Sequence, residues 1–566
     1  MSTETVYFLL PEIVLVLVAT AIYLGGAFSN ARDGWTWLAM SGLLLAGVAL
    51  SGQPLDGKLK AVDVVQSAEA DATESPALKD ADAKNDPPAN AVNNPLIVDQ
   101  FSQSMRWLIL ATGVVFVLFF WRAHARGESP ETIGSLLLIV AGLMIVVLAS
   151  DLVLLFVGLE LVSIPTYVVL ALGRPARDAG GMEATAKYFF LSVLSSALLL
   201  YGFSFLYGIA GSTSLFEIYS SLSKIAPDAP GLRTTAGLAL VLVVAGLGFR
   251  ITAVPFHFYA PDVYQGTSHA NAALLSVAPK IAGFTALVRV VAVAMPLAPI
   301  SWQLSLVLSV LTMTLGNLLA LWQNNIRRML AYSSIAHAGY MLIGFTVGLA
   351  EVKSLGDLDG LGSTFFYLAV YSLATIGAFA VLAYLSGDER QIDGVDELAG
   401  LSQTHSWMAG GMAIFMFSLT GLPPLAGFWG KFTLFLGALG VEAGANPPAS
   451  GAWKWFVGLA VAGSINAAIA AAYYLRVVAV MYFRTPLTVP AARRSLGPAL
   501  VAATCLVVLL VASFNPDPLI DRANQACQAA RLTFSPRQPD AATASAAPAH
   551  ALPSSHSPSA LAGEQR

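Results

Sequence analysis

The sequence predicts an all-α polytopic membrane protein with about fourteen transmembrane helices. Hydrophobic residues make up 56 % of the 566 positions and charged residues only 11 %, whereas a soluble domain carries roughly 25 % charged residues. The apolar runs are about 20 residues long, as a helix that crosses a bilayer requires, and they lack the alternating pattern of a transmembrane barrel. Mean hydropathy is +0.69. No nucleic-acid partner is expected for such a chain.

Fourteen spans are predicted along the chain, and two of them are interrupted. The seventh carries Pro255, and the twelfth carries the sequence GLPPLAG ahead of Lys431. Proline and glycine open a helix and leave backbone groups that need new partners. The predicted spans are 6–27, 34–51, 104–122, 132–149, 152–172, 184–209, 236–258, 270–295, 301–323, 328–348, 362–386, 406–438, 453–483 and 495–513.

Spans four to eight and nine to thirteen form two sets of five, and the fourth span is the broken one in each set. An odd-numbered repeat used twice in succession must be inverted in the membrane, an architecture that places ion sites near the midplane. The predicted organisation is 1–51 for the first two helices, 52–103 for a loop, 104–131 for the third helix and its loop, 132–295 and 301–483 for the two repeats, 484–513 for the last helix and 514–566 for a tail.

Two segments have the composition of disordered chain. Residues 52–103 are rich in Ala, Asp, Asn and Pro, and residues 514–566 are rich in Ala, Ser and Pro. Such segments cannot bury enough apolar surface to fold alone. An acidic disordered loop and a disordered tail are predicted, and a small docking element within either segment is the alternative. Cys505 lies in an apolar span and Cys527 in this tail, so neither a disulfide framework nor a cysteine metal site is expected.

Loop charges predict the orientation, because basic residues gather in cytoplasmic loops. With the N-terminus outside, the short outer loops hold only Lys224, Arg233 and Lys353. Both termini are therefore predicted on the non-cytoplasmic side. No basic segment precedes the first apolar run, so no cleavable signal peptide is expected. The inner loops then hold Arg32, Arg122, Arg126, Arg174, Arg177, Arg327, Arg328, Arg390, Arg484, Arg493 and Arg494.

The stretch 246–289 is apolar enough for a bilayer, yet it carries several ionisable residues. Lys280 lies about ten residues into the eighth span and follows a proline. A charge in hydrocarbon costs on the order of 2.5–3.5 kcal/mol on the gentlest scale, and a desolvated lysine can load and release a proton near neutral pH. Lys280 is the strongest candidate for a proton carrier, although a snorkelling lysine is the alternative.

Two further spans carry one central charge each. Glu160 lies in the middle of the fifth span, and Lys431 follows the glycines and prolines of the twelfth. An intramembrane carboxylate is a functional candidate and needs a basic partner. The opened helix ahead of Lys431 would offer free carbonyls to solvate its ammonium. A helix-end residue that faces water is the alternative for Glu160.

Lys187 lies about one turn into the sixth span, and Glu183 precedes it by four residues. The two therefore share a helix face and can form an ion pair. A role in proton transfer and an interfacial lysine that reaches the headgroups remain equal alternatives.

Arg250 differs from the lysines because a guanidinium does not give up its proton. It is predicted to act as a fixed charge or as the partner of a carboxylate. His257 and His337 are possible relays, since histidine titrates near neutrality, or are core residues. Arg327 and Arg328 lie at a predicted inner boundary and are interpreted as topology anchors.

The chain has no nucleotide-binding loop, haem motif or cysteine cluster, so no redox chemistry and no metal are expected in it. Four of its motifs resemble the antiporter-like membrane subunits of respiratory complex I, the proton-translocating NADH:quinone oxidoreductase. These motifs are GLGFRITAVPFHFYAPDVYQG, APKIAGF, NNIRRMLAYSSIAHAGYMLIG and GLPPLAGFWGKF. The sequence PDVYQG, with a lysine in the twelfth span, is most similar to the subunit N type, the homologue of mitochondrial NADH dehydrogenase subunit 2.

The resemblance implies a proton path in a bacterial inner membrane, driven by electron transfer from NADH to quinone in other subunits. Those subunits would hold NADH, FMN, iron–sulfur clusters and the quinone, and the partners would be other membrane-arm subunits. The family's functional residues fall on Glu160, Lys187, Lys280 and Lys431. Its usual seventh-span lysine is replaced here by Arg250.

Three alternatives remain from the sequence alone. A subunit of a multisubunit cation/proton antiporter would have a similar fold and the same lysines. A membrane scaffold with inactive ion sites would explain Arg250, but three intact buried charges argue against it. Subunits L and M of complex I are near relatives, and a subunit L would carry a long lateral helix where this chain has a polar tail.

Overall fold

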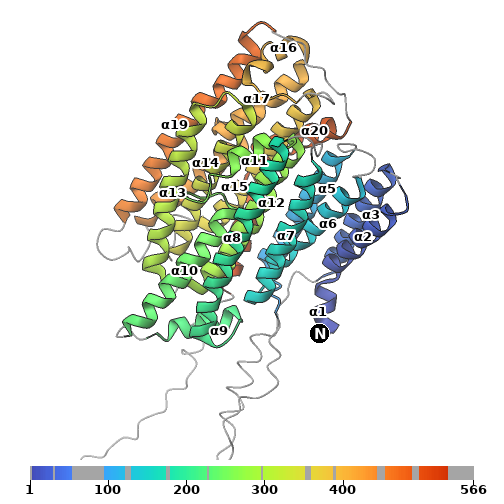
Figure 1. The fold of residues 1–566 in the computed structure, drawn as a ribbon. Helices are drawn as coiled ribbons and strands as arrows, with labels where there is room; N and C mark the ends of the chain where they lie inside the picture. Colours follow the sequence, from blue (N-terminus) through green and yellow to red (C-terminus); the bar gives the residue numbers. More distant parts are fainter. Residues whose placement is uncertain are drawn as a thin grey trace, which may run out of the picture.

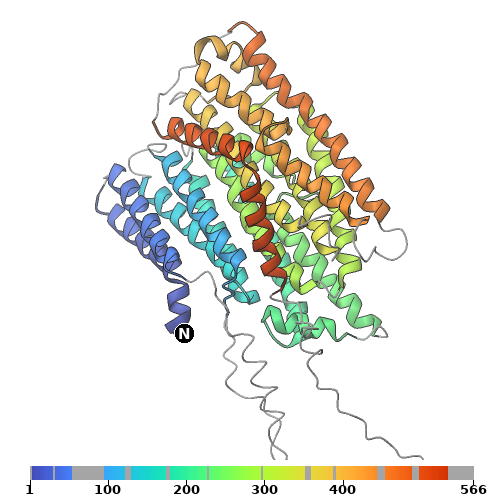
Figure 2. The ribbon, with the colours of Figure 1, turned by 180° about the vertical axis from the view of Figure 1, so that it is seen from behind.

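The computed structural model shows a bundle of helices that lie roughly side by side (Figure 1). Within the described residues, α2 and α3 lie at one edge of the bundle, α13 and α19 lie at the opposite edge, and α12, α14 and α15 lie between them; Figure 2 shows the same order from behind. The structure describes residues 3–29, 32–53, 95–121, 129–173, 179–225, 229–294, 297–350, 359–386, 391–442, 453–486 and 496–532.

Twelve helices in these ranges are long and apolar enough to cross a membrane, which confirms the predicted fold class. Two shorter apolar helices, α2 (Leu10–Gly26) and α17 (Ser406–Thr420), fall where spans were also predicted. The total of fourteen crossings and the inverted repeats stay predictions. The twelve are α3 (Arg32–Ser51), α5 (Gln100–Phe120), α6 (Ser129–Leu148), α7 (Leu152–Leu172), α8 (Ala179–Ala210), α10 (Pro230–Arg250), α12 (His269–Ala294), α13 (Ala298–Leu321), α14 (Ile326–Leu349), α15 (Gly360–Leu385), α19 (Trp453–Phe483) and α20 (Leu496–Phe514).

The shorter elements join or extend these helices. Two of them follow the breaks that were predicted in the seventh and twelfth spans. They are α1 (Thr3–Phe8), α9 (Leu215–Ser223), α11 (Ala260–Gly266), α16 (Leu401–Thr404), α18 (Ala426–Leu439), α21 (Asp517–Leu532) and the 3-10 turns Val395–Leu398 and Gly440–Glu442.

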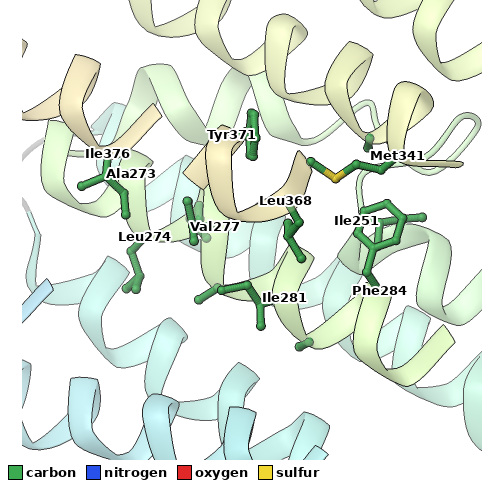
Figure 3. Close-up of a cluster of buried hydrophobic side chains, with 14 of the residues drawn as sticks. Ile251, Ala273, Leu274, Val277, Ile281, Phe284, Met341, Leu368, Tyr371 and Ile376 are labelled. Atoms are coloured by element: carbon green, nitrogen blue, oxygen red, sulfur yellow. The ribbon is translucent and has the colours of Figure 1, made fainter. Parts of the chain in front are cut away.

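The hydrophobic core centres on α12, and every residue of its apolar window is buried. Figure 3 shows Ala273, Val277 and Ile281 of this helix beside Leu368 and Tyr371 of α15. The spacing of four residues places the three α12 side chains on one face of the helix. The candidate lysine of α12 therefore lies in the most enclosed part of the molecule.

The two predicted helix breaks are present. α10 ends at Arg250, residues 251–259 are not helical, and α11 begins at Ala260. In the second break, α17 ends at Thr420 and α18 begins at Ala426. Each break leaves helix-terminal carbonyls without intrahelical partners close to a candidate site residue.

Both segments that were predicted to be disordered are partly ordered, so their predicted boundaries are wrong. Residues 95–99 are extended, and α5 begins at Gln100 rather than 104. α21 occupies 517–532 of the predicted tail and packs against α5 and α15, along the back of the bundle in Figure 2. Its buried Ile520, Ala526 and Cys527 supply an apolar face that average composition conceals. Residues 54–94 and 533–566 lie outside the described residues.

Two buried ion pairs fix the first helices to the rest of the bundle. Arg106 of α5 donates to both carboxylate oxygens of Glu12 in α2, each at 2.9 Å, and both side chains are buried. Arg289 of α12 donates to the two oxygens of Asp99 at 2.8 and 3.1 Å and to the carbonyl of Val147. The second pair anchors the helix that carries Lys280.

Candidate functional site

Lys280 lies near the middle of α12 and is fully buried. Its ammonium donates to the Ser334 hydroxyl of α14 at 2.6 Å and to the Thr252 hydroxyl at 3.1 Å. Thr252 lies in the break after α10 and has a positive φ of 60°. No salt bridge in the described part of the chain involves Lys280. Hydroxyl partners can accept from the ammonium and donate to the neutral amine, so the site accommodates both protonation states.

Ser334 joins Lys280 to a group of buried tyrosines. The Tyr371 hydroxyl of α15 donates to Ser334 at 2.8 Å, and the Tyr264 hydroxyl of α11 lies 3.5 Å from the same oxygen. The Lys280 ammonium lies 5.9 Å from the centre of the Tyr371 ring. The Ser334 hydroxyl therefore connects the Lys280 ammonium to Tyr371 of α15.

His337 lies one turn beyond Ser334 on α14, as its spacing of three residues requires. Its Nδ1 lies 2.5 Å from the Tyr367 hydroxyl, and its Nε2 lies 2.9 Å from the Tyr474 hydroxyl. The Tyr371 ring lies 5.1 Å from the imidazole. Both ring nitrogens thus have a hydroxyl partner that can donate or accept, as a relay requires.

Lys431 is buried in α18, and its ammonium donates to the carbonyls of Leu419 and Thr420 at 2.9 Å each. These carbonyls end α17, where the helix dipole is negative and intrahelical partners are missing. Gly421 follows with φ +89°, the left-handed conformation that ends a helix most readily with glycine. The expected solvation of Lys431 by carbonyls of an opened helix is therefore present.

The Tyr340 ring of α14 connects the histidine to Lys431. The Lys431 ammonium lies 4.7 Å from the centre of this ring, and the His337 ring lies 5.9 Å from it. Asn317 of α13 donates to the Tyr340 hydroxyl at 3.0 Å. The polar line Lys280–Ser334–Tyr371–His337–Tyr340–Lys431 therefore crosses from α12 through α14 and α15 to α18. Hydrogen bonds join its members as far as Tyr371, and ring contacts join them beyond it.

At the other end, Arg250 is buried at the last residue of α10. Its guanidinium pairs with Glu160 of α7 at 3.0 Å and donates to the Ser163 hydroxyl at 2.5 Å and the Leu159 carbonyl at 3.1 Å. The Ser196 hydroxyl of α8 donates to the same Glu160 oxygen at 2.5 Å. The expected pairing of Arg250 with a carboxylate is present. Thr252, which accepts from Lys280, lies two residues after Arg250 in the chain.

Lys187 is not brought together with the buried lysines. Its ammonium lies 2.7 Å from Glu183, as the spacing of four residues predicted, and 2.7 Å from Asp262 of α11. Arg328 of α14 also pairs with Asp262 at 2.7 Å. All four of these side chains are partly exposed.

His257 and Arg327 also have surroundings that the sequence did not indicate. His257 lies half-buried in the break after α10, and no hydrogen bond among the described residues joins it to Lys280 or Arg250. Arg327 is buried and donates to the Thr267 carbonyl, to Gln391 and to Asp393. Arg327 is therefore a buried member of an ion pair whose Asp393 partner is half-exposed, and its interpretation as a topology anchor stays a prediction.

Several members of the polar line were not singled out from the sequence. The motif around His337 contains Ser334, and Tyr367 and Tyr371 are spaced by four residues on one face of α15. Serine and tyrosine are common in membrane helices, so only the fold distinguishes these from packing residues. In the described residues, no group of three or more His, Cys, Asp or Glu side chains could hold a metal ion.

The sequence matches a known family of membrane subunits. Residues 149–446 match the family model described as NADH:quinone oxidoreductase/Mrp antiporter, TM. NADH-quinone oxidoreductase subunit N of Rhodospirillum rubrum is 35 % identical over 533 residues, which cover 93 % of this chain and 97 % of that protein.

Solved structures with the same fold include chains of two membrane complexes. A chain of respiratory complex I from Thermus thermophilus has a TM-score of 0.67 and 29 % identity, and the match covers 90 % of this chain and 98 % of that chain. A chain of the Mrp complex from Dietzia sp. has a TM-score of 0.72 over 94 % of this chain and 99 % of that chain. Its identity is 20 %, so this second likeness concerns the fold alone.

Proposed function

This chain belongs to the family of membrane subunits shared by NADH:quinone oxidoreductase and the Mrp antiporters, and we propose that it translocates protons as subunit N of an NADH:quinone oxidoreductase. The observation that carries the proposal is the buried polar line from Lys280 to Lys431. Relatives named as this subunit share 34–39 % identity with the chain. The polar line supplies the path for protons, and the redox reaction belongs to partner subunits.

Protons move along the line by exchange between neighbouring groups. Lys280 holds a proton against Ser334 and Thr252. The Tyr371 hydroxyl donates to Ser334, so it must turn and accept from Ser334 before a proton moves on toward the His337 ring, which lies 5.1 Å from the Tyr371 ring. The imidazole accepts on one nitrogen and releases from the other, and the proton then reaches Lys431 beside the Tyr340 ring. Uptake is from the cytoplasm, and release is on the opposite side of a bacterial inner membrane.

Glu160 and Arg250 form the driving end of the line. Arg250 keeps its proton under all conditions and acts as a fixed positive charge, while Glu160 can weaken or strengthen its pairing with it. Moving one proton against about 150 mV costs roughly 3.5 kcal/mol. The driving step must therefore change the relative proton affinity of the lysines by about two to three pKa units.

The chemistry of the complex requires partners. NADH, FMN, iron–sulfur clusters and quinone reside in other subunits, and this chain contacts other membrane-arm subunits, including further antiporter-like ones. Both termini face away from the cytoplasm. A reporter that is active only in the cytoplasm should stay dark when fused to the C-terminus, and a bright fusion would reverse the proposed topology.

The test of the function is to purify the complex through a tag on this chain. The proposal expects flavin and iron–sulfur absorbance in the purified complex and proton uptake into vesicles when NADH is oxidised. A complex without these chromophores that exchanges Na⁺ for protons would instead identify a multisubunit antiporter, and the proposal would be abandoned.

A further inference from the structure

The Asp262 carboxylate of α11 holds together two other helices. Its Oδ2 accepts from Lys187 of α8, and its Oδ1 accepts from Arg328 of α14, each at 2.7 Å. Arg328 also donates to Gln265 of α11 at 2.9 Å. One short helix is therefore fixed by its charges to α8 on one side and to α14 on the other.

Tight packing fixes α11 on the side of α8. A Cβ on Gly266 would lie 2.5 Å from the Cβ of Ala184 and 2.7 Å from the carbonyl oxygen of Gly180. Only glycine allows the two backbones to approach so closely. The ion pairs and this contact together determine where α11 lies.

The position of α11 determines the surroundings of Lys280. The Tyr264 hydroxyl of α11 lies 3.5 Å from the Ser334 hydroxyl, and the Ser334 hydroxyl accepts a hydrogen bond from the Lys280 ammonium. α11 is also continuous with the non-helical segment 251–259, whose Thr252 is the second partner of Lys280. A shift of α11 would move both neighbours of the lysine.

The chemistry of Asp262 fits a fixed anion better than a proton carrier. Partial burial alone would raise the pKa of this carboxyl, but the hydrogen bonds and charges of Lys187 and Arg328 outweigh burial and hold the pKa below its ordinary value. The group therefore stays ionised at neutral pH.

We propose that Asp262, Lys187 and Arg328 form a clamp that holds α11 between α8 and α14 and so positions Thr252 and Tyr264 around Lys280. This proposal rests on the proposed proton path and removes Lys187 from it. Lys187 is then a positioning residue, and its ability to release a proton is not used.

The decisive variant is Lys187→Arg, compared with Lys187→Met in the whole complex in membrane vesicles. Arginine keeps the charge and the hydrogen bond to Asp262 but cannot release its proton. The clamp predicts near wild-type pumping per NADH oxidised in Lys187→Arg. In Lys187→Met it predicts a loss of pumping of roughly three- to tenfold, because α11 and the groups that it positions around Lys280 would be displaced. Loss of pumping in Lys187→Arg at normal assembly would overturn the proposal.

A second set of variants separates the clamp from a proton-carrying Asp262. Lys187→Met combined with Arg328→Met leaves the carboxylate in place but without its cations. The clamp predicts that this double variant pumps as poorly as Asp262→Asn, and that combining all three changes lowers pumping little further. Normal pumping by the double variant would contradict the clamp.

Two controls keep the outcomes distinct. Lys454→Met changes a lysine of α19 outside the clamp and should pump as the wild type does. The amount of assembled complex is measured through NADH oxidation with an artificial acceptor that does not require the membrane arm. If the wild-type complex itself fails to pump, the proposed function fails; if only Lys187→Arg fails, the clamp fails and the proposed function stands.

Discussion

Arg250 is the buried basic residue beside the polar line that cannot release its proton. A lysine at this position could carry a proton, whereas the guanidinium reaches Glu160, Ser163 and the Leu159 carbonyl at once. Its planar fork suits several acceptors in fixed directions. We infer that the position serves as a permanent charge that pairs with Glu160.

Substitution of Arg250 tests that inference. Arg250→Lys keeps the charge but loses part of the hydrogen bonding, so pumping per NADH oxidised should be unchanged or lower. Arg250→Met should lower it roughly tenfold or more, because removal of one partner leaves the other charge largely buried and unpaired. Both are measured in vesicles as proton uptake against NADH oxidation.

A rise of pumping in Arg250→Lys would contradict the fixed-charge account. It would mean that position 250 carries protons in the family and that the arginine is a defect in this chain. Equal amounts of assembled complex are the condition for the comparison.

At the residue scale, the sequence identified the charged groups and missed the hydroxyl groups between them. Lys280 and Lys431 stand out because a charge in an apolar run is costly. Ser334 and Tyr371 carry no such signal, and their importance arises from contacts between α12, α14 and α15. The roles of Glu160, Lys280 and Lys431 in proton transfer stay predictions, and the predicted role of Lys187 in proton transfer is replaced by the proposed positioning role.

At the scale of elements, the two breaks determine the site more than the intact helices do. The break after α10 presents Thr252 to Lys280, and the break after α17 presents two carbonyls to Lys431. Both breaks were predictable because clustered proline and glycine weaken a helix, although the single prolines Pro165 and Pro279 lie inside α7 and α12. Which side chains they would present could not be predicted, since that depends on neighbouring helices.

Gly421→Ala tests the second break. The positive φ at this position disfavours a side chain by about 1–2 kcal/mol, and the added Cβ would lie 3.0 Å from Cδ of Lys431. We expect lower pumping per NADH oxidised with the complex still assembled. Gly437→Ala in α18 is the matched control, since its added Cβ meets no atom within 4 Å.

If Gly421→Ala pumps as Gly437→Ala does, the geometry of the break does not matter to Lys431. The account of Lys431 as a group solvated by helix-end carbonyls would then lose its main support.

α21 shows why boundaries were harder to predict than spans. The segment is polar on average, and its apolar residues recur at helical spacing only on the face against α5 and α15. Such a helix is stabilised by tertiary packing rather than by propensity. The spans are apolar along their whole length, and for that reason most predicted spans lie within a few residues of the helices. The seventh is the exception, because α10 covers Pro230–Arg250 and the predicted span is 236–258.

At the scale of the whole molecule, α21 closes the back of the bundle at the start of α15. A Cβ on Gly362 of α15 would lie 2.7 Å from the Asn524 Cα of α21. Gly362→Leu should therefore displace α21 and expose Cys527, which is buried. Maleimide labelling measures this exposure, and a Cys527→Ser background shows whether any label is on Cys505.

Gly458→Leu is the control for that labelling, because a Cβ there meets no atom within 4 Å. Unchanged protection of Cys527 in Gly362→Leu would mean that α21 does not depend on this contact.

The whole bundle arranges one polar line across an apolar interior. The line begins near Glu160 and Arg250 on α7 and α10 and ends at Lys431 on α18, and its members come from several helices, three of them from α14. A protein organised in this way transfers protons only if its central lysine takes part.

The most direct test is therefore proton pumping against NADH oxidation in vesicles that carry Lys280→Ala in a fully assembled complex. The account predicts that pumping and NADH oxidation both fall, because the coupled path is interrupted. If both stay at wild-type levels, the buried lysines are not the path, and the central claim is wrong.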